Sequence, residues 1–401
     1  MAGENTSSTI NAWIKEIYAD NLQNLIPEGV RLVKAVKFLQ GDKELGDSYI
    51  QPVALTHESG FSVGSGAFSL NEAIAATYAQ AQVEGKNLLL RSKVSYDAMS
   101  RASNSKKAFM KWSEQIIGNM TSSFTKRLEI LHFYGGTGIG TVDSIASHVI
   151  TITDATWASG IWAGAEGVKL ESRASATQHD SALVVSSVDL VAKTITVTGD
   201  TDTVADDVLY FAGFYGNEMT GLDKIVTNTG TLFNIDASSY ALWKGNTYSA
   251  GTAALTFSKL QAAVSLGVAK GLDEKVTVYC SPATFANLNS DLAALRRSDS
   301  SYKSSKGQNG FEAITYYGVN GEIEVVPSIY VKEGEAFCVP LSRLKRIGST
   351  DVTMQMPGQA ADQLVLQLAS NAGYELRMFY DGTLFGERPA WCTKVTGIVN
   401  S

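Results

Sequence analysis

Residues 104–134 carry the strongest helical pattern in this chain. Apolar side chains recur there at steps of three or four residues, at Phe109, Trp112, Ile116, Met120, Phe124, Leu128 and Leu131. This spacing predicts a single amphipathic helix. At about 1.5 Å per residue the helix would be roughly 46 Å long, which exceeds the width of a small domain.

The helix is expected to end at a glycine-rich run, residues 135–140. A run of this kind cradles a phosphate when a strand precedes it and a helix follows it, because the helix N-terminus then faces the anion. Here the helix comes first and β-type sequence follows. We therefore interpret the run as a hinge.

Two segments that bury little within their own chain precede the helix. Residues 1–30 are typical of an arm, with a short helix-like piece around Trp13 and Ile17. Residues 31–102 predict a long two-stranded excursion with strands at 48–56 and 88–96 and a glycine-punctuated middle, in which Ser69 and Glu72 could open a short helix as a capping box. Because an isolated hairpin is marginal in water, the excursion is expected to pack on something outside its own domain.

The sequence after the hinge changes in character. Residues 141–232 contain 14 Thr among short β-type runs, which predicts an inserted all-β module, either a small barrel or a sandwich. They hold 4 Lys and Arg against 12 Asp and Glu, whereas the remaining residues hold 29 against 28. The chain's net charge of −7 therefore lies in this module. Nucleic-acid-binding modules show the opposite bias, so sequence-specific DNA binding is not expected.

Helices and strands mix from about residue 233 onward. A helix is predicted over 257–270 with its stop at Gly271, followed by a strand over 275–280 and a second helix with Ser281 as N-cap. Strands are predicted in 312–339, with a hairpin turn at 320–321, and in 352–398, with a turn at Asp381 and Gly382.

Residues with catalytic or metal-binding potential form no convincing constellation. Ser62 lies in a Gly-x-Ser-x-Gly pattern, but a hydrolase also needs Asp and His partners in an α/β context. Cys280, Cys338 and Cys392 are far apart, and neither they nor the four His show metal-ligand spacing, so no metal or cofactor is expected. No apolar run is long enough to span a membrane and no secretion signal is present, which predicts a protein kept in the cytoplasm.

A local basic strip leads into the long helix. It consists of Arg91, Lys93, Arg101, Lys106, Lys107 and Lys111, opposed only by Asp97. The strip is either a solvated face or a surface for non-specific contact with phosphate or with an acidic partner. The sequence leaves both interpretations open.

The order of these parts resembles the major capsid protein of tailed double-stranded DNA bacteriophages, also called the Johnson fold. Residues 88–98 are similar to the returning strand of that family's extended loop, and residues 234–246 are similar to its passage into the axial domain. The resemblance implies an α+β fold. Its expected parts are an N-terminal arm (1–30), an extended loop with the spine helix (31–140), a β-rich insertion domain (141–232), an axial domain (233–345) and C-terminal strands of the peripheral domain (346–401). The spine helix corresponds to the long helix predicted over 104–134.

The resemblance implies a structural protein rather than an enzyme. Such a subunit self-assembles in the bacterial cytoplasm into hexamers and pentamers of an icosahedral shell, the virion capsid, which encloses DNA without sequence-specific contacts. The candidate inter-subunit contacts are Trp13, Ile17, Tyr49, Phe61 and Phe68. A portal and a decoration protein are further expected partners. A separate scaffolding protein is also expected, because the chain starts almost directly at the arm.

Three further expectations accompany this interpretation. The acidic β insertion should project outward, since packaged DNA would repel it. Some relatives link the extended loop to a neighbour through Lys and Asn, and Lys43 is a candidate donor for such a link. Two alternative functions stay open: a serine hydrolase that uses Ser62, and a host-surface-binding protein that uses the β insertion.

Overall fold

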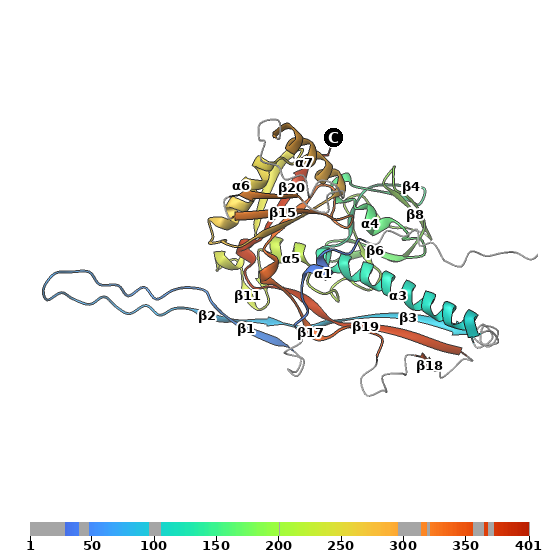
Figure 1. Cartoon of the computed structure of the whole chain (residues 1–401), viewed down its shortest axis with the longest axis horizontal. Helices are drawn as coiled ribbons and strands as arrows, with labels where there is room; N and C mark the ends of the chain where they lie inside the picture. The colour runs from blue at the N-terminus through green and yellow to red at the C-terminus, as the bar shows by residue number, and fades with distance from the viewer. Residues whose placement is uncertain are drawn as a thin grey trace, which may run out of the picture.

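The computed structural model describes residues 29–39, 48–95, 106–199, 201–295, 314–318, 321–355, 365–367 and 373–400. Its most prominent helix is α3 (Lys106–Tyr134), which confirms the long helix predicted from the apolar periodicity. Gly118 does not interrupt it. Figure 1 shows α3 lying along a sheet at the base of the molecule, below two compact units.

The basal sheet is built around one long strand, β19 (Gly373–Gly386). Its partners are β17 (Leu344–Thr353), β18 (Val365–Gln367) and β3 (Lys86–Ser95), all antiparallel to it. The apolar stripe of α3 packs on the inner face of this sheet, where Phe124 and Leu128 meet Leu376, Met378 and Tyr380. The short helix α1 (Leu32–Ala35) joins the same cluster through Val33.

The turn predicted at Asp381 and Gly382 is wrong, because β19 runs through both residues without a break. Asp381 pairs with Asn87 of β3 on one side and with Thr350 of β17 on the other. Hydrogen bonds from two neighbouring strands hold the backbone extended, and they override the local turn preference of an Asp-Gly pair. The irregularity lies instead in β17, whose pairing with β19 shifts register on both sides of Thr350.

The excursion leaves this sheet as a narrow hairpin. Its root is β1 (Tyr49–Ala54) paired antiparallel with β2 (Tyr78–Val83). The sequence predicted both strands at 48–56 and 88–96, but the second belongs to β3 and pairs with β19. Beyond the root, residues 55–77 extend far from the rest of the chain (Figure 1). They contain no helix, so the capping box predicted at Ser69 and Glu72 does not form.

The β insertion forms a closed barrel. Its strands are β4 (Gly140–Ala146), β5 (Val149–Ile152), β6 (Lys169–Ala174), β7 (Thr177–Asp189), β8 (Thr194–Thr198) and β9 (Val208–Phe211), in the order β4-β5-β8-β7-β6-β9. A short helix, α4 (Ser159–Trp162), lies between β5 and β6. The barrel closes at Phe211. The sequence extended the module to residue 232, but that remainder holds α5 (Leu222–Thr227) and the small pair β10 (Thr231–Leu232) and β11 (Ile235–Asp236).

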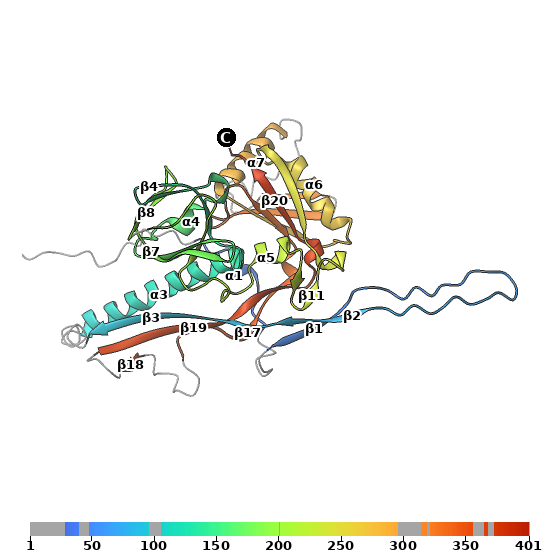
Figure 2. The same ribbon diagram turned by 180° about the vertical axis from the view of Figure 1, so that it is seen from behind.

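The second compact unit is a six-stranded sheet with two helices, seen from behind in Figure 2. In spatial order its strands are β12 (Asn246–Ala253), β20 (Thr393–Ile398), β16 (Ala336–Val339), β13 (Val276–Cys280), β15 (Gly321–Pro327) and β14 (Ile314–Gly318). The helices α6 (Phe257–Val268) and α7 (Pro282–Leu295) follow the predicted positions.

Local signals in this unit act as the sequence indicates. Gly271 has a positive φ of 94° just after α6, as expected of a helix stop. The Ser281 hydroxyl accepts the N–H of Thr284 at 3.3 Å and caps α7. One assignment needs correction: β20 lies between β12 and β16, whereas the sequence placed residues 346–401 together in another domain. Sheet pairing separates β20 from β17–β19.

A buried carboxylate fastens the beginning of the described chain to the spine helix. Glu129 of α3 is fully buried and accepts the backbone N–H groups of Arg31, Leu32 and Val33 at 2.7–2.8 Å. These are the donors that α1 leaves unpaired at its start. Burial raises the pKa of Glu129, and the three N–H groups oppose that effect.

We expect Glu129→Ala to destabilise the folded protein by about 2 kcal/mol or more, because it leaves buried N–H donors without partners. Urea unfolding followed by circular dichroism measures the change. The matched control is Glu58→Ala on the exposed excursion, which should change the free energy of unfolding by less than about 0.5 kcal/mol. Equal effects of the two substitutions would contradict this role of Glu129.

His132 on the same helix makes stability depend on pH. Its Nδ1 lies 2.7 Å from the Leu128 carbonyl oxygen, and its buried Nε2 has no hydrogen-bond partner within the described residues. Burial, with a smaller contribution from Arg346, lowers the pKa of His132 from 6.5 to about 4. The unfolded chain therefore binds this proton first, so stability is lost as the pH falls from about 6.5 to about 4.

We expect the wild-type subunit to lose about 3 kcal/mol through His132 over that pH range. His132→Leu removes the titrating group, so its free energy of unfolding should fall less between pH 7 and pH 4. Parallel urea titrations of both proteins at several pH values provide the measurement. Identical pH dependence would show that His132 does not titrate in this way.

Candidate assembly surfaces

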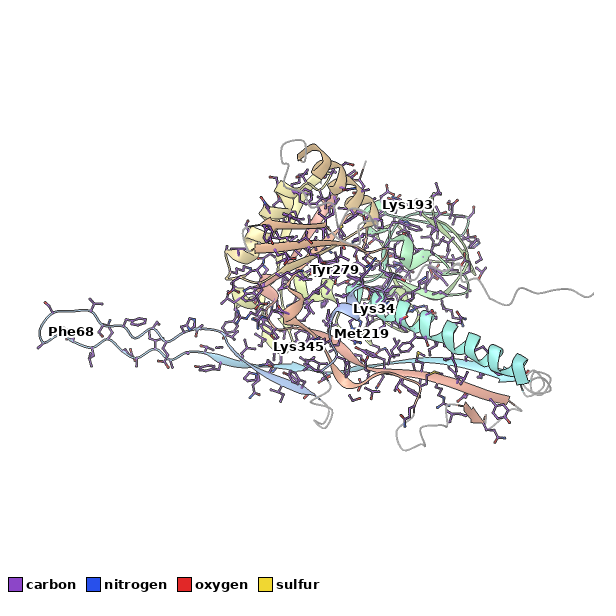
Figure 3. All side chains as sticks on the ribbon, in the orientation of Figure 1. Lys34, Phe68, Lys193, Met219, Tyr279 and Lys345 are labelled. Carbon is purple, nitrogen blue, oxygen red and sulfur yellow. The ribbon has the colours of Figure 1, made fainter. Side chains whose placement is uncertain are left out.

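The excursion carries apolar side chains that its own chain does not cover. Among the described residues, a large share of the exposed large apolar side chains lies on it: Ile50, Phe61, Val63, Phe68, Leu70, Ile74 and Tyr78. Phe61 is 79% exposed and Val63 is 96% exposed. Figure 3 shows Phe68 near the tip of the hairpin, far from the compact units. Exposed apolar groups gathered on one element indicate an interaction surface.

The root of the excursion, in contrast, is firmly packed. Ala81 and Val83 are buried in the main core cluster. The Tyr49 ring packs edge-on against Phe385, with centroids 6.2 Å apart. The Gln82 N–H donates to the Phe233 carbonyl at 3.0 Å. The excursion is therefore an arm with a fixed base and an unpartnered tip.

The structure separates the five predicted contact residues. Phe61 and Phe68 lie exposed on the excursion, and their role as inter-subunit contacts stays a prediction. Tyr49 is half-buried and contacts its own chain instead. Trp13, Ile17 and the candidate cross-link donor Lys43 lie outside the described residues. Val63 and Leu70 are more exposed than Phe61 and Phe68, but neither was singled out from the sequence as a contact. Val63 lies within the glycine-rich stretch, and Leu70 follows it.

Ser62 has no catalytic surroundings. Its hydroxyl accepts the Asn71 N–H at 2.6 Å on the exposed excursion. His132 lies in α3, and His148 and His179 belong to the barrel region, where His179 pairs with Asp207. This geometry gives the serine-hydrolase alternative no support.

The basic strip is divided between several environments. Arg91 and Lys93 lie on the outer face of β3, opposite the side that packs on α3. Arg91 binds Glu375 of β19, which also binds Arg377. Desolvation opposes ionisation of Glu375, but the two guanidinium groups outweigh it and lower its pKa. Lys106, Lys107 and Lys111 occupy the first turns of α3, and Arg101 lies outside the described residues.

The barrel is fixed to the rest of the subunit at several points. From α3, Lys126 donates to the Ala163 carbonyl at 2.5 Å, and the Arg127 guanidinium lies 3.3 Å from the centroid of the Phe211 ring. Burial, and after it the charge of Arg127, lowers the pKa of Lys126 to about 8. On the other side the Gly160 N–H donates to the Ile329 carbonyl at 2.9 Å. A Cβ at Gly160 would lie 2.8 Å from the same oxygen, so the close approach requires glycine.

The glycine run at 135–140 is a compact junction. A Cβ at Gly135 would lie 2.2 Å from the Met219 carbonyl oxygen, and Gly138 has a φ of 83°. Behind this junction lie two buried lysines that sequence analysis missed. Lys332 donates to the Gly138 carbonyl at 3.0 Å, and Lys394 lies 2.6 Å from an Asp223 oxygen. The only sequence signal for these lysines was Lys394 itself, which is the one charged residue in the run 389–401.

Neither a metal-ligand cluster nor a membrane-spanning helix is found in the part of the chain that the structure describes. It contains no group of three or more His, Cys, Asp or Glu side chains that could hold a metal ion. Within the same residues, no helix combines the length and the apolar character required to cross a membrane.

Comparison with solved structures identifies the fold. The capsid asymmetric unit of cyanophage A-1(L) superposes with a TM-score of 0.61 at 12% identity, covering 98% of this chain and 99% of that one. The capsid of the native GTA particle (TM-score 0.52, 10% identity) and that of Myoviridae phage XM1 (0.51, 8%) each match 99% of this chain and 100% of theirs. No family model and no curated protein matches the sequence.

The chain therefore has the fold of these capsid proteins, with 98–99% of its length covered by the matches. The resemblance noted from the order of its sequence parts is confirmed for the fold. It is the capsid fold of the tailed phages, with a closed β barrel between the spine helix and the six-stranded sheet.

We expect simultaneous substitution of Phe61 and Phe68 by Ser to block association without unfolding the subunit, because neither side chain belongs to a core cluster of its own chain. Sedimentation velocity should show a shift from particles to free subunits, with an unchanged unfolding midpoint. A matched control replaces the exposed Val191 of the barrel by Ser. Normal particle yield from the double variant would contradict an assembly role for the tip.

Proposed function

We propose that this protein is the major capsid subunit of a tailed bacteriophage. In this role it assembles into hexamers and pentamers of an icosahedral shell that encloses double-stranded DNA, and it resides in the virion. The observation that carries the proposal is the full-length match to capsid structures, together with an excursion whose apolar tip has no partner in its own chain.

Assembly explains the distribution of apolar surface. An isolated chain must leave Phe61, Val63 and Leu70 in water, whereas a neighbouring copy can cover them. Each contact of this kind contributes little, but a closed symmetric shell repeats it many times. The buried root of the excursion supports the same function, because it aims the tip in one direction.

The acidic barrel distinguishes the outer surface of the proposed shell from the inner one. We infer that the barrel faces outward, since its excess negative charge would be repelled by packaged DNA. Its attachment to α3 through Arg127 and to the 328–335 segment through Gly160 supports a rigid rather than a tethered projection. Partners implied by the proposal are a scaffolding protein, a portal and a decoration protein, with DNA held by non-specific contact only.

The test is electron microscopy of the purified full-length chain, alone and with a candidate scaffolding protein. We expect closed shells of uniform diameter in at least one condition, with density for the barrel on the outer surface. A folded chain that stays monomeric under all assembly conditions would overturn the proposed function. Shells with the barrel on the inner surface would overturn only its inferred orientation.

A further inference from the structure

Three side chains from separate elements meet in the junction between the barrel, α5 and the six-stranded sheet. The Lys394 Nζ of β20 lies 2.6 Å from Asp223 Oδ1 of α5 and 2.7 Å from Glu335 Oε1, which directly precedes β16. The side chains of Lys394 and Asp223 are 8% and 7% exposed, and that of Glu335 is 14% exposed. The Phe337 ring centroid lies 5.7 Å from the same Nζ.

We propose that Lys394 and Asp223 form an intrachain amide bond, with Glu335 as the proton-transferring residue. The site holds the three groups this condensation requires: an amine, a carboxyl group in contact with it, and a second carboxylate in contact with the same nitrogen. No cofactor or oxidant enters the reaction. The product is a covalent tie between helix α5 and strand β20, 171 residues apart in sequence.

The reaction balances within these three residues. A proton passes from Lys394 Nζ to the Asp223 carboxylate, and the neutral amine then attacks Asp223 Cγ, so that an N–C bond forms. Glu335 accepts a second proton from the nitrogen and returns it to the leaving hydroxyl. The Cγ–O bond breaks, one water departs, and Glu335 ends in its starting ionisation state.

Burial and rigid positioning both favour this step. Lys394 is held by the register of β20, opposite Phe337 of β16 and beside Thr247 of β12. Groups fixed in contact react as though one were present at roughly 10⁵ M or more. A site that excludes water also favours condensation over hydrolysis. Glu335 Oε2 is buried with no hydrogen-bond partner in the described chain, so it has a free acceptor position.

Amide formation leaves the net charge of the junction unchanged. Burial opposes the charge of Lys394, but Glu335 and Asp223 outweigh it and raise its pKa, so the starting state is an ion pair. Amide formation removes one positive and one negative charge together. Burial lowers the pKa of the neighbouring Lys332, and the charge of Glu335, which the reaction leaves in place, partly opposes that effect.

The chain contains a matched control on its surface. Lys193 Nζ lies 2.8 Å from Asp154 and 2.8 Å from Glu333, which repeats the arrangement of one amine between two carboxylates. Asp154 is 85% exposed, so water and side-chain motion compete with any condensation there. The proposal therefore predicts an amide at Lys394 and none at Lys193.

The test is mass spectrometry of the folded full-length protein after denaturation. We expect the wild-type mass to be one water below the sequence mass, and trypsin to yield a branched peptide that joins Asp223 to an uncleaved Lys394. Glu335→Gln should fold with the full sequence mass and release both peptides separately. Lys193→Arg should keep both the mass deficit and the branched peptide.

A folded wild-type protein that keeps its full sequence mass and is cleaved at Lys394 would overturn the proposal and leave an ion pair. This outcome can be read from the wild type alone, even if the Glu335→Gln variant fails to fold. A mass deficit that persists in folded Glu335→Gln would reject the role given to Glu335. The measurement does not require particles, so its failure leaves the proposed capsid function untouched.

Discussion

The packing of α3 against the inner face of β3 and β19 is the interaction on which the rest of the subunit depends. A helix of 29 residues with one apolar stripe needs a surface of matching length, and the 14-residue strand β19 with its partner β3 supplies it. Phe124 and Leu128 reach Leu376, Met378 and Tyr380 along this contact. The barrel, the six-stranded sheet and the excursion are all placed relative to this helix-on-sheet layer.

Buried charged side chains fix the positions at which separate elements of the fold meet. Glu129 receives three backbone N–H groups where the chain approaches α3, and the buried Lys332 donates to the Gly138 carbonyl at the junction that follows α3. Burying a charge costs free energy unless its partners are well placed. Such groups therefore specify position more than they add stability, since a displaced element would leave a charge unpaired in the core. In the proposed shell, that specificity would present the same shape to every neighbouring copy.

The excursion, in contrast, leaves apolar side chains exposed. Its root shares the main core through Ala81 and Val83, while its far part exposes Phe61, Val63 and Leu70. A single chain gains nothing from such an element, because it orders backbone without burying apolar surface. Repeated contacts with neighbouring copies would offset that cost. The proposed assembly would use both the rigid frame and the exposed hairpin.

Local patterns of sequence determined the elements whose causes are local. The periodicity of 104–134 predicted α3, and Ser281 and Gly271 marked the helix ends, because capping and amphipathicity act within a few residues. The sequence also named Phe61 and Phe68 as contact candidates, and that role stays a prediction. Tertiary structure alone decided the partner of β3, the unbroken course of β19 through Asp381 and Gly382, and the meeting of Lys394 with Asp223. Lys394 and Asp223 lie 171 residues apart, and Asp381 pairs with Asn87 and Thr350 of two other strands. Pairing between separate segments leaves no trace in either segment read by itself.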